Sequence, residues 1–226
     1  MPEIAFLDLP SGRRIAYRTR AGAAPTLVFF PGYASDMEGA KAQALDGFAE
    51  RRGVGMLRLD YSGTGSSPGD FADGTLEHWL EESLAAVDRL TSGPLILVGS
   101  SMGGWIALHV ALRRPDRVQA LVGIAVAPDF TDWGLQRGSG GITDAFRASG
   151  QRLLLLGGEI AVDCPVRLVH GEADGDVPLD IAFRTMRALR SSDVQLAVIK
   201  GGSHRLSEPH DIDAILRIVA GLLEPA

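Results

Sequence analysis

Apolar segments of strand length alternate with longer segments of helical periodicity along most of the chain. The first two strand-like segments, residues 4–9 and 13–20, are separated by Pro10-Ser11-Gly12, which predicts a hairpin. Further strands are expected over residues 26–30, 55–59, 95–99, 118–126, 166–170 and 194–199. Several of these are unbroken runs of Val, Ile and Leu, a pattern typical of strands buried on both faces of a parallel sheet.

Helical segments lie between these strands and are expected over residues 37–52, 75–90, 102–113, 179–189 and 212–223. The first of them stops at Gly53, a residue that commonly follows the end of a helix. Repeated alternation of strand and helix after an opening hairpin predicts the α/β class. We expect a mostly parallel sheet of about eight strands, with an antiparallel hairpin at its start and helices on both faces.

Residues 128–163 interrupt this alternation, because the segment is longer than one crossover helix requires. It contains glycine-rich residues 138–141, a helix-like stretch at 143–147 and four successive leucines at 153–156. A chain of 226 residues suits one buried core, so we expect residues 1–226 to form a single domain. Residues 128–163 are then a small cap or lid insertion above the carboxyl edge of the sheet. The leucines are expected either to line an apolar channel or to form a helix of this cap.

The charge balance and the cysteine count narrow the possible partners and compartments. Lys and Arg number 22 and Asp and Glu number 28, giving a formal charge of −6 without the basic clusters that nucleic-acid binding needs. No apolar run approaches the roughly 20 residues of a membrane span, and the start lacks the pattern of a signal peptide. Cys164 is the only cysteine, which fits a reducing compartment. We therefore expect a cytoplasmic protein without a nucleic-acid partner, a membrane span or a metal.

A G-x-S-x-G motif formed by Gly99, Ser101 and Gly103 lies between an expected strand and an expected helix. In that context the serine occupies a tight turn that exposes its hydroxyl, and side chains two residues away on either side would collide. The start of the helix supplies backbone N–H groups that can stabilise a developing oxyanion. Ser100 is adjacent, but only Ser101 has glycine at both flanking positions, so we predict that Ser101 is a nucleophile.

A serine nucleophile needs a base, and the base needs an acid that holds its tautomer. His204 follows the expected strand 194–199 directly, so it emerges at the same sheet edge as Ser101 and is the predicted base. The acid is expected in the loop after strand 166–170, which offers Glu172, Asp174 and Asp176. Asp176 is close to the cap of the next helix, whereas Asp174 is far enough from both elements to turn inward, which favours Asp174.

The other histidines fit structural positions better than catalytic ones. His210 follows Pro209 at an expected helix start, where a surface position is expected. His78 and His109 fall within expected helices and are interpreted as surface or packing residues. His170 ends a strand before Gly171 and is interpreted as a structural turn residue.

A second oxyanion donor is expected from Pro31-Gly32-Tyr33, which follows strand 26–30. Glycine allows a tight turn there, so that the backbone N–H of Tyr33 can point to the same place as the N–H of Met102. Removing one such donor typically costs on the order of 3 kcal/mol of transition-state stabilisation. The alternative interpretation of this segment is a simple Pro-Gly turn.

Four segments together resemble the α/β-hydrolase family, and more narrowly the branch formed by alpha/beta-hydrolase domain-containing protein ten and its bacterial relatives. They run in the family's order and nearly span the chain: residues 29–33, 58–67, 97–105 and 164–171. The resemblance implies the α/β-hydrolase fold and, as nucleophile, acid and base, Ser101, Asp174 and His204. It also implies hydrolysis of thioesters and esters, namely S-acyl cysteine and acyl glucuronides. Residues 128–163 are shorter than in the animal proteins of this branch, so substrate identity is the least transferable property.

The residues and the resemblance together predict a serine esterase or thioesterase that needs no cofactor. Ser101 would attack an acyl carbonyl, and water activated by His204 would release the acid. Three alternatives use the same fold: a hydrolase of lactones or carbon–carbon bonds, a perhydrolase, and a binding module without activity. The substrate is expected to be a small molecule or an acylated protein.

Overall fold

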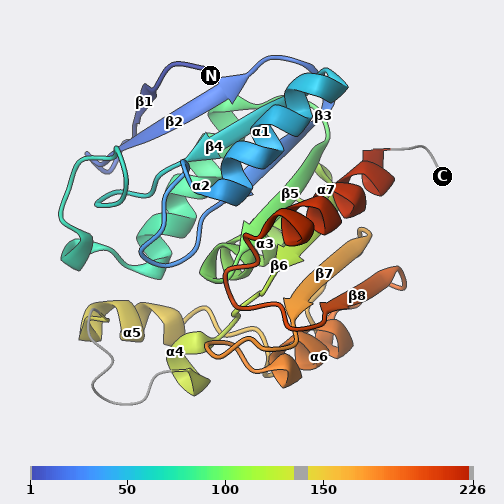
Figure 1. Ribbon diagram of the computed structural model, residues 1–226. Helices are drawn as coiled ribbons and strands as arrows, with labels where there is room; N and C mark the ends of the chain where they lie inside the picture. Colours follow the sequence, from blue (N-terminus) through green and yellow to red (C-terminus); the bar gives the residue numbers. More distant parts are fainter. Residues whose placement is uncertain (1, 135–141, 224–226) are drawn as a thin grey trace.

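The computed structural model describes residues 2–134 and 142–223. In these residues one eight-stranded sheet has the order β1-β2-β4-β3-β5-β6-β7-β8 (Figure 1). The strands β1 and β2 pair antiparallel, β2 pairs antiparallel with β4, and all remaining pairs are parallel. Their bounds are Ala5–Asp8 (β1), Arg14–Arg20 (β2), Ala23–Phe30 (β3), Val54–Leu59 (β4), Leu95–Ser100 (β5), Val118–Ile124 (β6), Val166–Gly171 (β7) and Val194–Ile199 (β8).

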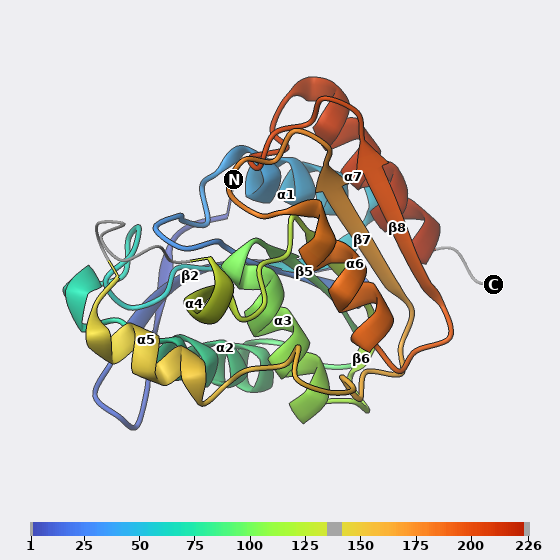
Figure 2. The same cartoon turned by 90° about the horizontal axis from the view of Figure 1, so that it is seen from below.

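Helices cover both faces of the sheet (Figures 1 and 2). Their bounds are Ala40–Arg52 (α1), Leu76–Leu90 (α2), Met102–Arg113 (α3), Phe130–Trp133 (α4), Asp144–Gln151 (α5), Leu179–Ala188 (α6) and Pro209–Leu223 (α7), with a 3-10 turn at Phe71–Asp73. Side chains of α1 and α7 form one apolar core with one face, and those of α2 and α3 form a larger core with the other. The predicted fold class, strand number and opening hairpin are confirmed.

Several expected boundaries were wrong, for identifiable reasons. The helix expected over residues 37–52 begins only at Ala40, because the Met37 carbonyl accepts a hydrogen bond from Arg58 Nη1 instead of from a helical N–H. β3 begins at Ala23 and not at Thr26, because Ala23 pairs with Val54 of β4. Pairing with a neighbouring strand overrides the low strand propensity of alanine and proline.

The segment between β6 and β7 contains α4, α5 and an irregular stretch, and its glycine-rich residues 138–141 lie outside the described residues. The four leucines at 153–156 are not helical, so a cap helix at this place was wrong. The carboxylate of Asp129 accepts the N–H groups of Leu155 and Leu156 at 2.8 and 2.6 Å, and Gly157 follows. A side chain that takes up backbone donors competes with helix formation.

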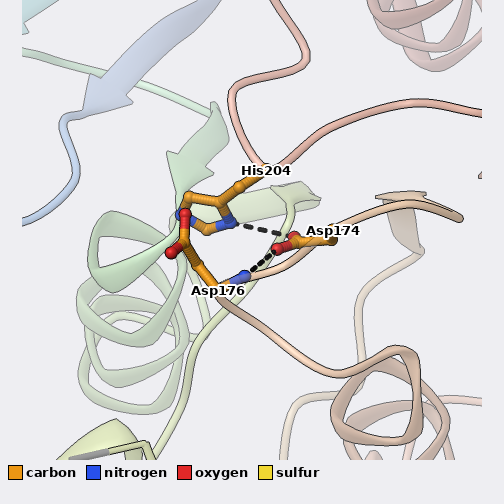
Figure 3. Close-up of side chains that lie close together, drawn as sticks. All are labelled: Asp174, Asp176 and His204. Carbon is orange, nitrogen blue, oxygen red and sulfur yellow. Dashed lines mark hydrogen bonds and ion pairs between the residues drawn. The ribbon is translucent and has the colours of Figure 1, made fainter.

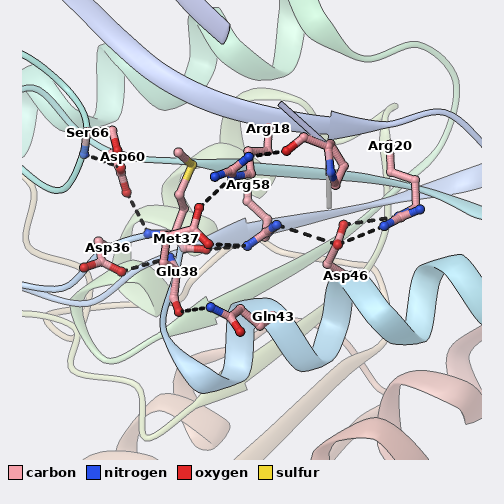
Figure 4. A network of polar contacts seen from close by, with 11 residues as sticks. Arg18, Arg20, Asp36, Met37, Glu38, Gln43, Asp46, Arg58, Asp60 and Ser66 are labelled. Atoms are coloured by element: carbon pink, nitrogen blue, oxygen red, sulfur yellow. Dashed lines mark hydrogen bonds and ion pairs between the residues drawn. The ribbon is translucent and has the colours of Figure 1, made fainter. Parts of the chain in front are cut away.

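A buried polar network fixes the loop after β3 (Figure 4). Arg58 is fully buried and donates through Nη1 to the Met37 carbonyl at 2.7 Å. Asp60 accepts the Met37 N–H at 2.6 Å, so this residue is held on both sides of its backbone. Asp46 lies 3.6 Å from Arg58 and also pairs with Arg20. The network therefore ties the loop that contains Tyr33 to the centre of the sheet.

Candidate active site

Ser101 lies between β5 and α3 with φ 55° and ψ −119°, a strained conformation for a residue with a side chain. Its N–H donates to Ile124 at 2.8 Å and its carbonyl accepts from Ala127 at 3.2 Å, so β6 and the residues after it hold the turn. A Cβ on Gly99 would lie 2.3 Å from the Gly103 carbonyl oxygen, and one on Gly103 would lie 2.1 Å from that of Phe30. Only glycine fits at these two places.

His204 and Asp174 reach Ser101 from two loops that follow neighbouring parallel strands. Asp174 follows β7 and His204 follows β8, at the edge of the sheet where β5 ends. His204 Nε2 is 3.1 Å from Ser101 Oγ. On the other side of the ring, His204 Nδ1 is 2.9 Å from Asp174 Oδ2 (Figure 3). Because a carboxylate only accepts hydrogen bonds, Nδ1 carries the proton and Nε2 is left to accept from the serine hydroxyl. The structure thus brings together the three residues predicted from the sequence.

Asp174 is almost completely buried, with 1% of its side chain exposed. Oδ1 accepts the backbone N–H groups of Asp176 and Val177 at 2.9 and 2.8 Å, while Oδ2 faces His204. Burial by itself raises the pKa of Asp174, but the hydrogen bond from His204 and those from the backbone outweigh it and lower the pKa below its ordinary value. The carboxylate is therefore held ionised.

The other acidic candidates of this loop have different positions. Glu172 accepts the N–H of Gly201 at 3.0 Å and is exposed. Asp176 does not cap α6, since the N-cap is Pro178 and makes no side-chain hydrogen bond. Its exposed carboxylate lies beside the His204 ring in Figure 3. His170 is fully buried beneath the loop, and its Nε2 donates to the Val177 carbonyl at 3.0 Å, in keeping with a structural role.

The two expected oxyanion donors lie beside Ser101. Met102 begins α3, and the first N–H groups of a helix have no intrahelical acceptor. Tyr33 follows Gly32, where a Cβ would lie 3.4 Å from Ser101 Cβ. The Tyr33 ring packs against Phe71 and Phe146 with centroids 5.1 and 5.2 Å away, which holds the residue in place. Tyr33, Ser101 and Met102 line one common cavity.

Two cavities meet at Ser101, Tyr33 and His204, and they differ in character. The first, which we call the apolar cavity, has a volume of about 390 Å³ and includes Phe130, Trp133, Ile142 and Val177 in its lining, with Asp176 at its border. The second, which we call the polar cavity, has a volume of about 490 Å³. Its lining includes Ser35, Asp36, Lys41, Arg205 and Ser207. The serine and histidine therefore border two spaces, of which only the second is lined by Lys41 and Arg205.

Sequence reasoning missed most residues of these two cavities. Phe130 and Trp133 belong to α4, which has four residues and is too short to produce a helical pattern. Lys41 and Arg205 are 164 residues apart, and nothing in their local sequence links them. The leucines at 153–156 line neither cavity in the described part of the chain, so the expected channel role finds no support.

In the described residues, one group of side chains has donor atoms close enough to bind a metal: Asp174, Asp176 and His204, with atoms within 4.8 Å of one another. Two of these atoms already share the hydrogen bond between Asp174 and His204. The donor set is therefore better explained by proton transfer than by metal binding. Among the helices of the described residues, none has the length and apolar character to cross a membrane.

Comparisons with known proteins agree with this geometry. Residues 25–156 match the family model described as alpha/beta hydrolase fold. Human palmitoyl-protein thioesterase ABHD10, mitochondrial, is 34% identical over 245 residues, covering 98% of this chain and 80% of that protein. The solved structure of mouse alpha/beta hydrolase domain-containing protein 10 has a TM-score of 0.93 at 35% identity and covers 98% of both chains. A putative hydrolase from Agrobacterium vitis has a TM-score of 0.89 at 37% identity and covers 99% of both chains. The chain belongs to the α/β-hydrolase family.

Proposed function

We propose that this protein is a serine hydrolase that cleaves esters or thioesters of acyl groups through an acyl-enzyme intermediate. The observation that carries the proposal is the continuous hydrogen-bonded series from Ser101 Oγ through His204 to Asp174, at 3.1 and 2.9 Å. A serine held this way has a base in reach and an acid that sets the tautomer of the base. The name of the human relative, a palmitoyl-protein thioesterase, supports the same bond type.

In the acylation step, Ser101 Oγ attacks the acyl carbonyl carbon while His204 Nε2 takes the serine proton. The negative charge that develops on the carbonyl oxygen is stabilised by the backbone N–H groups of Tyr33 and Met102. The bond to the leaving thiol or alcohol then breaks, and His204 returns the proton to the departing sulfur or oxygen. Asp174 stays ionised and stabilises the imidazolium that forms between these transfers.

In the deacylation step, water replaces the leaving group. His204 removes a proton from the water, hydroxide attacks the acyl carbon, and the serine oxygen leaves as it regains a proton from His204. The carboxylic acid is released, so that one water is consumed and one acid and one thiol or alcohol are formed.

The apolar cavity is the proposed acyl site, because aromatic and aliphatic side chains remove a hydrocarbon chain from water. α4 supplies Phe130 and Trp133 to it, so we propose that residues 128–163 act as the cap of a single domain. The substrate classes implied by the resemblance, S-acyl cysteine and acyl glucuronides, remain predictions. Location in the cytoplasm also remains a prediction, since the human relative is named as a mitochondrial protein.

The proposal is tested with purified protein and its Ser101→Ala variant. We expect the wild type to be labelled by a fluorophosphonate probe and to hydrolyse short p-nitrophenyl esters and S-acyl thioesters, while the variant does neither and retains its thermal unfolding transition. Turnover that is unchanged in Ser101→Ala would rule out the assignment. Lactone, carbon–carbon and peroxide substrates in the same assay separate the alternative reactions, and an unlabelled wild type would favour a binding module.

A further inference from the structure

The polar cavity contains two cationic side chains that form no salt bridge within the described residues. Lys41 comes from α1 and Arg205 directly follows His204, and both line the cavity that Ser101 and His204 border. Lys41 Nζ donates a hydrogen bond to the backbone carbonyl of Arg205. Within residues 2–134 and 142–223, no Asp or Glu oxygen lies within 4.0 Å of either cationic group. Asp36 also lines the cavity, and its carboxylate accepts the N–H of Glu38 at 2.8 Å. The two cationic side chains outnumber this one carboxylate in the lining.

Keeping two like charges together in a partly buried place is unfavourable without a partner. Burial first, and then the charge of Arg205, lower the pKa of Lys41, while the charge of Asp211 opposes this only in part. Arg205 is charged at every physiological pH. An anion bound in the cavity would offset the repulsion between Lys41 and Arg205, and it would compensate for the loss of water around the Lys41 ammonium group.

The two cavities both border the proposed reaction centre, so each can hold a different part of the substrate. The attacked carbon carries the acyl chain on one side and the leaving group on the other. Because Ser101 and His204 border both cavities, an acyl chain in the apolar cavity directs the leaving group toward the polar one.

We propose that the polar cavity is the leaving-group site and that Lys41 and Arg205 bind a carboxylate carried by the departing thiol or alcohol. This inference rests on the proposed ester or thioester hydrolysis. It adds that the enzyme prefers substrates whose leaving group is negatively charged. Guanidinium and ammonium groups bind carboxylates through charge-assisted hydrogen bonds, which are about twice as strong as neutral ones. The chemical step itself is unchanged: His204 still protonates the leaving atom.

The test uses two thioesters that differ only in charge, the S-butanoyl thioesters of 3-mercaptopropionic acid and of its amide. We expect wild-type protein to have a higher kcat/KM on the acid than on the amide. Lys41→Gln and Arg205→Gln should each lower this acid-to-amide ratio about tenfold, as expected for the loss of a hydrogen bond to a charged group. Lys41→Arg should preserve the preference, and so should the matched control Lys200→Gln, because Lys200 is exposed and lines neither cavity.

The outcomes separate this inference from the proposed function. Hydrolysis of both thioesters with equal kcat/KM by the wild type, or a ratio unaffected by both Gln substitutions, would overturn the leaving-group site while leaving the hydrolase proposal intact. No hydrolysis of either compound together with an unlabelled Ser101 would overturn the proposed function itself. If Lys41→Gln unfolds, Arg205→Gln carries the test, since Arg205 is exposed. Added salt should lower the wild-type ratio, because it screens an exposed ionic contact.

Discussion

Replacing Asp174 by asparagine tests the orientation of the proposed base. The substitution keeps the size of the side chain but converts one oxygen into a donor. Oδ1 of Asp174 accepts two backbone N–H groups, from Asp176 and Val177, at 2.9 and 2.8 Å. The asparagine oxygen must occupy that position, because turning the amide around would break both hydrogen bonds and set donors against donors, at a cost of about 2 kcal/mol or more.

The amide NH₂ is therefore directed at His204 Nδ1, which must then accept a hydrogen bond. Nε2 takes the proton instead and no longer accepts from Ser101 Oγ, 3.1 Å away. In the Ser-His-Asp enzyme for which the tautomer effect is established, the same change lowers kcat about 10⁴-fold. We expect a loss of similar size here, equivalent to about 5 kcal/mol of transition-state stabilisation.

The assay is pre-steady-state acylation by p-nitrophenyl acetate, with thermal unfolding followed on the same samples. Asp174→Asn should lose acylation but unfold close to the wild-type temperature, because both backbone hydrogen bonds survive. Asp174→Ala should lose acylation and unfold at a lower temperature, because those two N–H groups lose their acceptor. Glu172→Gln, in the same loop, is the matched control and should acylate normally. An Asp174→Asn variant that keeps more than about a tenth of the wild-type rate would refute the tautomer argument.

Three further predictions concern the turn, the cap and pH. Gly103→Ala should abolish activity and lower the unfolding temperature, because its Cβ would lie 2.1 Å from the Phe30 carbonyl oxygen; Gly157→Ala, with nothing within 4 Å, should change neither in the same measurements. Trp133→Ala enlarges the apolar cavity, so the preferred acyl length in a p-nitrophenyl ester series should increase; an unchanged series would contradict the acyl-site assignment. Burial lowers the pKa of His109 to about 4, so the folded protein binds fewer protons than the unfolded chain and stability falls as pH drops from about 6.5 towards 4. Urea unfolding of His109→Gln should show a weaker pH dependence over that range than the wild type.

Much of the fold followed from short-range pattern. Buried strands such as Leu95–Ser100 and helices such as Met102–Arg113 carry their periodicity within a few residues, so their order along the chain was readable. The parallel arrangement then determined which strand ends share an edge, and hence that residues after β7 and β8 approach Ser101. Where long-range contacts set the backbone conformation, the sequence pattern was misleading. Met37 fits a helical pattern but lies in a turn, because its backbone is hydrogen-bonded to Asp60 and Arg58, which are distant in sequence.

The sequence by itself therefore determined the fold class, the place of Ser101 on a glycine-flanked turn and the candidates for its partners, because each of these depends on local backbone geometry and chain order. The sequence favoured Asp174 as the acid, but only the tertiary structure decided how its carboxylate is held, since two backbone N–H groups bind one oxygen and leave the other facing His204. It alone also decided the two cavities, whose linings combine side chains of α1 and α4 with several loops that are far apart in the sequence. A cavity forms where side chains from several segments pack against one another. Its shape and charge therefore cannot be read from the periodicity of any one segment.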